Sequence, residues 1–169
     1  MTEFSRFRIG KLDHVHIRVP DQSEAAAWYS KHLGFEPVGD YDFWASGVDG
    51  GPLQISADGG ATMLALFQAG EGHPMVVQQT GVAFSVDLET FSAFTRSLPG
   101  EINAPTGQPL VADSMVDFDL CWAFDLADPW RAHSAAAKQA LLHGAPGRKL
   151  KSQVEGARGR DDRARGGRE

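Results

Sequence analysis

Residues 14–21 of the chain read His-Val-His-Ile-Arg-Val-Pro-Asp, and the fold prediction starts from this stretch. Its aliphatic residues alternate with His14, His16 and Arg18, and alternate residues of a β-strand point to opposite faces. We therefore predict a half-buried strand that carries both histidines on the face away from its aliphatic side chains. Pro20 ends this strand, and Asp21 is suited to cap a helix that begins directly after it.

The residues that follow predict the order βαβββ. A helix is expected from about residue 24 to residue 33, and Gly34 suits its C-terminal end. Three strand patterns come next, at residues 35–44, 52–57 and 62–68, with Gly-Gly pairs at the turns. Within the first of them, the alternating aromatics Tyr41 and Phe43 are the strand signal.

The same order restarts near residue 80. Residues 80–86 predict a strand, and residues 88–98 carry apolar side chains at helical spacing. A shift of 67 residues lays His14 over Gly81 and aligns the two opening strands, which indicates an internal repeat. Further strands are predicted at residues 109–112 and 118–126. We therefore predict one module at residues 11–70 and a second at residues 78–130.

The C-terminal part departs from this repeat between Trp130 and Arg131. The second module needs one more strand, but the Ala-rich residues from Pro129 to Gly144 predict a helix instead. Residues 145–169 consist mostly of Gly, Arg, Lys, Asp and Ala and are expected to be disordered. We therefore expect residues 131–169 to form an atypical tail and the second module to lack its last strand. The unpaired edge left beside residues 118–126 then predicts a protein that dimerises, swaps modules or is poorly soluble, and of these we expect a homodimer.

Length and composition restrict the class of protein. The chain has 169 residues, 42% of them hydrophobic, which is a globular composition. No apolar run is long enough to span a membrane, and residues 1–10 lack the apolar core of a secretory signal. Cys121 is the single cysteine, so an intramolecular disulfide is excluded and a reducing cytoplasm is expected.

The net charge of −6 is distributed unevenly along the chain. Residues 131–169 hold ten Lys and Arg against four Asp and Glu, a net charge of +6, so residues 1–130 carry −12. An acidic body repels nucleic acid, although the basic tail offers nonspecific phosphate contacts. The same acidic body suits a polar or cationic small molecule. The sequence contains no phosphate-binding loop, nucleophile elbow or dinucleotide fingerprint.

These patterns resemble the vicinal oxygen chelate superfamily, which includes glyoxalase I, the extradiol dioxygenases and the bleomycin resistance proteins. The resemblance implies an α+β fold of two βαβββ modules, each of which forms half of a cup, with a divalent metal between the halves. Five segments carry it: the strand at residues 14–21, KHLGF at residues 31–35, MLALF at residues 63–67, GVAFSVD at residues 81–87 and WAFDLADPW at residues 122–130.

The resemblance implies an incomplete set of metal ligands. Its first ligand position falls on His14, but the next two fall on Ala65 and Gly81, whose side chains cannot bind a metal. The fourth position, a Glu in many members, falls near Ala135. Because a divalent metal site normally needs three or more protein ligands, we predict no cofactor, with a divalent metal at His14 as the alternative.

The candidate pocket residues are His14, His16, Tyr41, Trp44 and Trp122. The two histidines are expected to face the cup, whereas the three aromatic residues are either pocket wall or core. Two functions are open, and they leave it undecided whether the protein is an enzyme. One is a metal-free module that binds a small-molecule ligand, as in the bleomycin resistance branch. The other is a metal-dependent lyase or dioxygenase of the glyoxalase I or extradiol type.

Overall fold

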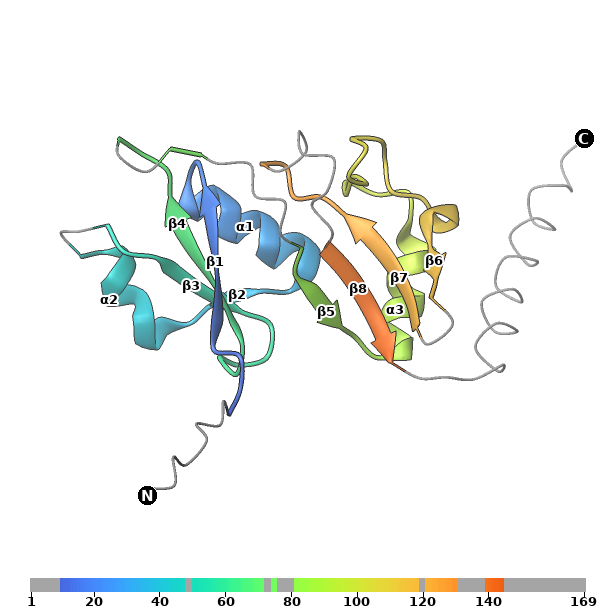
Figure 1. Ribbon diagram of the computed structural model, residues 1–169, viewed down its shortest axis with the longest axis horizontal. Helices are drawn as coiled ribbons and strands as arrows, with labels where there is room; N and C mark the ends of the chain where they lie inside the picture. Colours follow the sequence, from blue (N-terminus) through green and yellow to red (C-terminus); the bar gives the residue numbers. More distant parts are fainter. Residues whose placement is uncertain are drawn as a thin grey trace, which may run out of the picture. The chain divides into compact units, whose positions relative to one another are not determined.

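The computed structural model describes residues 10–47, 50–71, 74–75, 81–118 and 121–130, and the backbone of residues 139–144. The chain folds as two compact units, Met1–Val76 and Val77–Glu169. Figure 1 labels the elements of both. Among the described residues, no helix has the length and apolar character needed to cross a membrane.

The first unit has the predicted βαβββ order. Its sheet runs β1-β4-β3-β2, with β1 parallel to β4 and the other pairs antiparallel. The first and last strands are therefore neighbours, which places His16 opposite Ala65 and Ala65 opposite Gln54. The elements are β1 (His14–Val19), α1 (Gln22–Leu33), β2 (Glu36–Pro37), β3 (Leu53–Ser56) and β4 (Met63–Gln68).

The ends of α1 form as the local sequence predicts. The Asp21 side chain accepts a hydrogen bond of 2.8 Å from the backbone N–H of Glu24, and Gly34 adopts a positive φ of 70°. The helix packs against the sheet and closes the core of the unit. The fully or almost fully buried apolar residues of this core include Ile17, Val19, Ala25, Ala26, Tyr29, Ile55, Leu64 and Leu66.

The strand predicted over residues 35–44 is wrong beyond Pro37. A 3₁₀ turn, η1 (Gly39–Tyr41), and a short helix, α2 (Asp42–Ala45), follow β2 instead. The rings of Tyr41 and Trp44 lie three residues apart in sequence and 4.9 Å apart in space, as neighbours on a helical turn do. The aromatic spacing therefore belongs to a helical turn, which packs beside β3.

The second unit repeats the same order, so the internal repeat is confirmed. Its sheet runs β5-β8-β7-β6, again with the first and last strands parallel. Asp87 caps its helix, and the rings of Phe91 and Phe124 stack 5.4 Å apart between helix and sheet. Its elements are β5 (Ala83–Ser85), α3 (Leu88–Ser97), η2 (Ala112–Ser114), β6 (Val116–Asp117), β7 (Cys121–Leu126) and β8 (Gln139–Gly144).

The strand predicted at residues 109–112 is also absent from the structure. Pro109 makes only an isolated bridge with Asn103, and the 3₁₀ turn η2 begins at Ala112. This isolated bridge is not part of a strand, and the second sheet consists of β5, β6, β7 and β8.

The prediction that the second module lacks its last strand is wrong. Residues 139–144 form β8, which pairs with β7 along six residues and with β5 along three. The helix predicted up to Gly144 is therefore replaced by a strand in this segment, because the ladders of β5 and β7 outweigh the helix propensity of an Ala-Leu-Leu stretch. Residues 131–138 and 145–169 lie outside the described residues.

Strand β8 also removes the stated ground for a homodimer. Strand β7 is paired with β6 on one side and β8 on the other, so it offers no free edge of the kind the sequence suggested. The homodimer itself stays a prediction, which the oligomeric state in solution would test.

Candidate functional site

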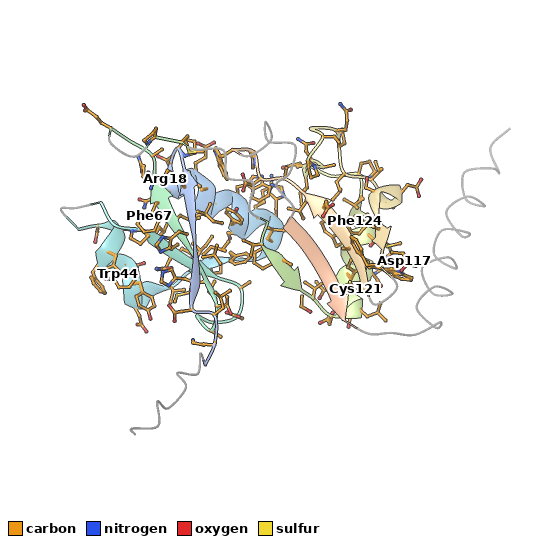
Figure 2. The ribbon with its side chains drawn as sticks, viewed as in Figure 1. Arg18, Trp44, Phe67, Asp117, Cys121 and Phe124 are labelled. Carbon is orange, nitrogen blue, oxygen red and sulfur yellow. The ribbon has the colours of Figure 1, made fainter. Side chains whose placement is uncertain are left out.

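A pocket of about 470 Å³ lies in the first unit, and three of the predicted site residues line it, namely His14, His16 and Trp44. Its volume falls within the range of ligand-binding pockets in proteins. Figure 2 shows Trp44 on α2 and Phe67 on β4. The complete lining is His14, His16, Phe43, Trp44, Gly47, Gly51, Pro52, Gln54 and Phe67.

The two histidines form a close pair on one face of β1. Their rings stack with centroids 4.9 Å apart and planes inclined by 13°, and their Nε2 atoms lie 3.0 Å apart. A single proton between these nitrogens makes the contact a hydrogen bond. The ring of Phe67 packs 4.7 Å from that of His16, so the pair is held against the sheet.

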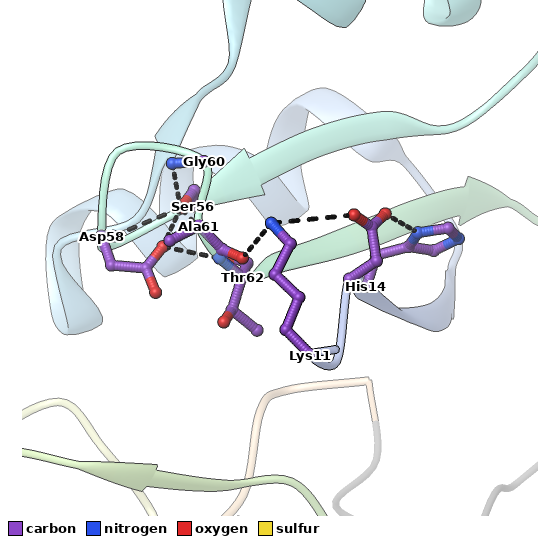
Figure 3. A network of polar contacts seen from close by, with 8 residues as sticks. Lys11, His14, Ser56, Asp58, Gly60, Ala61 and Thr62 are labelled. Atoms are coloured by element: carbon purple, nitrogen blue, oxygen red, sulfur yellow. Dashed lines mark hydrogen bonds and ion pairs between the residues drawn. The ribbon is translucent and has the colours of Figure 1, made fainter. Parts of the chain in front are cut away.

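Asp13 sets the orientation of His14. Its carboxylate accepts a hydrogen bond of 2.8 Å from Nδ1 of His14, which lowers the pKa of the Asp13 carboxyl. With its Nδ1 protonated, a neutral His14 ring presents the lone pair of Nε2, and Nε2–H of His16 donates to it. Figure 3 shows the hydrogen bond between the His14 ring and the carboxylate, and beside it Lys11, whose Nζ donates to the carbonyl of Ala61 at 3.0 Å. The start of β1 is thus tied to the turn before β4.

Aromatic side chains form the other wall of the pocket. Phe43 and Trp44 are 62% and 38% exposed, unusually high values for large apolar side chains, and their rings meet edge to face at 5.5 Å. Tyr41 does not line the pocket, although its ring packs against that of Trp44. A flat apolar ligand would cover this exposed aromatic surface.

The loop that carries Gly51 holds Trp44 in place. The backbone N–H of Gly51 donates to the carbonyl of Trp44 at 3.0 Å. The side-chain amide of Gln22 donates to the carbonyls of Gly51 at 2.8 Å and Leu66 at 2.7 Å, which ties the loop to β4. The pocket wall is therefore fixed by hydrogen bonds to the helix α1 and to the sheet.

Gln54 and Phe67 are pocket residues that the sequence analysis missed. Register explains both: Gln54 lies opposite Ala65, and Phe67 lies two residues beyond Ala65 on β4, so all three share one sheet face. For Gln54, the signal available in the sequence was a polar residue between the apolar residues Leu53 and Ile55 of a strand pattern. Interpreting it requires the pairing of β3 with β4, which local sequence does not specify.

The fifth predicted residue, Trp122, lies in the second unit. It is 7% exposed in β7, where its backbone pairs with Asp117, and it is not among the residues that line this pocket. The structure therefore places Trp122 in a sheet core, which is one of the two roles that the sequence left open.

The residues present do not fit the metal site that the resemblance implies. Ala65 is completely buried in β4, and no group of three or more His, Cys, Asp or Glu residues is placed to hold a metal in the part of the chain that the structure describes. His14 and His16 supply two nitrogens on one strand, fewer than a divalent metal site normally has. We therefore derive no chemistry through a metal.

The turn between β3 and β4 carries a second polar network, which Figure 3 also shows. The Asp58 carboxylate accepts from the backbone N–H of Thr62 at 2.9 Å, and the hydroxyl of Ser56 lies 2.7 Å from it. The hydrogen bond from Thr62, followed by that from Ser56, lowers the pKa of the Asp58 carboxyl. The ionised form of Asp58 therefore stabilises the turn.

An Asp58→Asn variant is expected to be slightly less stable than the parent at neutral pH. Because the pKa of Asp58 in the folded protein lies below the unfolded value of 3.8, its carboxylate stabilises the fold at pH values above 3.8. This stabilisation is lost as the pH falls through the folded-state pKa. The difference between the two proteins should therefore shrink in acid. Thermal unfolding from pH 7 down to pH 2.5 measures it, and a constant difference across that range would contradict the role of the charge.

Residues 11–98 match the family model described as the Glyoxalase/Bleomycin resistance protein/Dioxygenase superfamily. The match spans the whole first βαβββ unit and continues through α3 of the second. The chain belongs to this superfamily, as the repeated order of its strands and helices had suggested. No curated protein matches the chain significantly.

Solved structures with the same fold cover most of the chain at low sequence identity. TnmS3, an antibiotic binding protein from Streptomyces sp. CB03234, is 18% identical with a TM-score of 0.56, over 83% of this chain and 100% of that one. The oxidase ChaP-H2 is 16% identical with a TM-score of 0.54, over 83% and 98%. A glyoxalase/dioxygenase from Nostoc punctiforme is 16% identical with a TM-score of 0.51, over 80% and 91%. Identities this low support the fold alone.

Proposed function

We propose that this chain is a cytoplasmic binding protein that holds a small aromatic molecule in the first-unit pocket without a metal. The observation that carries the proposal is the combination of an open aromatic wall with one exposed and one buried polar side chain. Phe43 and Trp44 supply flat apolar surface, while His16 and Gln54 supply hydrogen-bonding atoms on the facing sheet. Pockets of this composition use apolar contacts for affinity and a few polar groups for orientation.

The lining also refines the expectation of a cationic ligand. None of the nine lining residues is a carboxylate, so the acidic charge of the chain is not concentrated in this pocket. A neutral aromatic ligand suits the lining better than a cation. The antibiotic-binding protein TnmS3 has the same fold, which supports small-molecule binding as a use of this architecture.

A metal-dependent lyase or dioxygenase remains the second candidate function because the Nε2 atoms of His14 and His16 converge to 3.0 Å. Asp13 behind His14 is the kind of carboxylate partner that orients metal-bound histidines. Against it stands Ala65, which occupies a ligand position of the family with a methyl group. The two functions make opposite predictions about chelation.

The full-length protein is expected to bind the flat probe 2-naphthol equally well before and after treatment with EDTA and dialysis. No metal ligand contributes to the proposed pocket, so chelation removes nothing that the probe contacts. Protein NMR titration gives the affinity, and elemental analysis of the untreated protein is expected to find far less than one divalent metal ion per chain.

A Trp44→Ala variant serves as the positive control and should bind 2-naphthol about tenfold more weakly, since it removes a stacking surface. Trp28→Ala is the matched control, because the Trp28 ring packs on Tyr29 and His32 and does not line the pocket. One equivalent of tightly bound metal that is lost in His14→Ala would instead establish the second candidate function.

A further inference from the structure

Gln54 is the one buried side chain in the described residues whose polar atom has no hydrogen-bond partner. It is 1% exposed, and its Oε1 accepts no hydrogen bond from any described group. Its backbone is fixed, since its carbonyl accepts from the N–H of Val38 at 2.9 Å. A buried acceptor without a partner is costly and uncommon in folded proteins, so its presence calls for a physical explanation.

The position of Gln54 in the sheet explains why no protein group reaches Oε1. Leu53 and Ile55 point to one face of β3 and Gln54 to the other, where it pairs across to Ala65, whose methyl group has no hydrogen-bond donor. The side chain lines the first-unit pocket, whereas Oε1 itself is closed to solvent in the free protein, so a ligand in the pocket reaches Oε1 when the side-chain amide turns toward it.

Gln22 shows what a structural glutamine looks like in the same unit. Its amide nitrogen donates to two backbone carbonyls, at 2.7 and 2.8 Å, and ties α1 to the pocket loop and to β4. Gln54 makes no such tie through its side chain. The amide of Gln54 therefore contributes an acceptor to the pocket rather than a brace to the fold.

We propose that Gln54 makes the pocket selective for aromatic ligands that carry a hydrogen-bond donor, such as a phenolic hydroxyl or a ring N–H. This inference rests on the proposed binding function. In the free protein Oε1 is out of reach of solvent and has no partner, so a ligand donor that bonds to it satisfies an acceptor that was unpaired before binding. A ligand without a donor leaves Oε1 unpaired and therefore binds more weakly. The aromatic wall of Phe43 and Trp44 sets the flat shape of the ligand, and Gln54 sets where its donor lies.

The test compares 2-naphthol with 2-methylnaphthalene, which replaces the hydroxyl by a methyl group of similar size. Both probes are titrated by NMR into the full-length parent protein and into Gln54→Met, which has a similar volume but no acceptor. The preference for 2-naphthol over 2-methylnaphthalene should fall by about tenfold in Gln54→Met, the size expected for one buried hydrogen bond. Comparing ratios cancels the different solubilities of the two probes.

Unfolding of the ligand-free proteins supplies a second, independent readout. Gln54→Met should unfold at a higher temperature than the parent, because it removes an unpaired buried acceptor. Gln22→Met, the same substitution at a glutamine whose amide nitrogen donates two hydrogen bonds, should unfold at a lower temperature. A Gln54→Met variant that unfolds earlier than the parent overturns the proposal, since the amide would then be a structural group.

The binding results separate this proposal from the proposed function. If both probes bind and their ratio is the same in Gln54→Met as in the parent, donor selectivity is wrong while the binding function stands. If neither probe binds the parent, both the binding function and the selectivity proposal are wrong. A ratio that falls in Gln54→Met but is the same in the parent and in Trp28→Ala, whose ring does not line the pocket, supports both.

Discussion

An Ala140→Pro substitution is expected to lower the free energy of unfolding by about 2–4 kcal/mol and to disrupt the second sheet. Ala140 lies in β8 between two neighbours, opposite Ala83 of β5 and Asp125 of β7. Proline removes the backbone N–H, and in a strand paired on both sides that N–H always faces a neighbouring strand. A carbonyl of β5 or β7 is then left without its donor.

Hydrogen exchange measures this effect strand by strand. The amides of β5 and β7 should lose protection in Ala140→Pro, while those of β1 and β4 in the first unit keep theirs. Val116→Pro is the matched control, because β6 pairs only with β7 and an edge strand tolerates proline better. Unchanged protection in Ala140→Pro would mean that residues 139–144 do not complete the sheet, as the sequence alone suggested.

A Gly51→Ala substitution should weaken 2-naphthol binding at least about tenfold and destabilise the protein by about 1–3 kcal/mol, a typical cost of overpacking. A Cβ atom at Gly51 would lie 2.6 Å from the carbonyl oxygen of Trp44, far inside van der Waals contact. The group in the way is backbone, so relief requires α2 or the loop to move. That movement breaks the hydrogen bond from Gly51 to Trp44 and shifts the aromatic wall.

Gly70→Ala is the control for this prediction, since a Cβ there meets nothing within 4 Å. Urea unfolding gives the stability of both variants, and the same NMR titration gives their affinity for 2-naphthol. A Gly51→Ala protein with the stability and affinity of Gly70→Ala would contradict the close approach of the loop to α2.

Local chemistry explains the parts of the fold that were predicted from the sequence. Asp21 and Gly34 bracket α1, and the alternation from His14 to Val19 produces β1, as expected. These signals act over a few residues and need no distant partner. The repeat added the second module, because an element order that recurs along the chain is a property of the sequence itself.

Two of the wrongly assigned segments share one physical reason. The spacing of the aromatic residues after Pro37 fits an alternating strand and a helical turn equally well. In the structure these residues form the helical turn α2, which packs against β3. Residues 139–144 favour a helix by composition, yet they form β8 because β5 and β7 offer unpaired ladders on both sides. In both cases the deciding contacts are made with other elements of the unit and not within the segment itself.

The candidate site divides in a similar way. His14 and His16 were predicted to share a face because they are two residues apart on one strand, and the stacking of their rings follows from that spacing. Gln54 and Phe67 join them through register with Ala65, which only the assembled sheet specifies. A polar residue inside a short strand does not by itself reveal whether it faces a pocket.

The sequence by itself determined the βαβββ repeat, the capped helices and the pairing of two histidines on the first strand, because these depend on neighbours in the chain. The tertiary structure alone decided that residues 139–144 complete the second sheet and that Gln54 faces an aromatic pocket with its acceptor unpaired. Strand pairing brings together residues that are distant in sequence, and the hydrogen-bonding needs of those partners set the final arrangement.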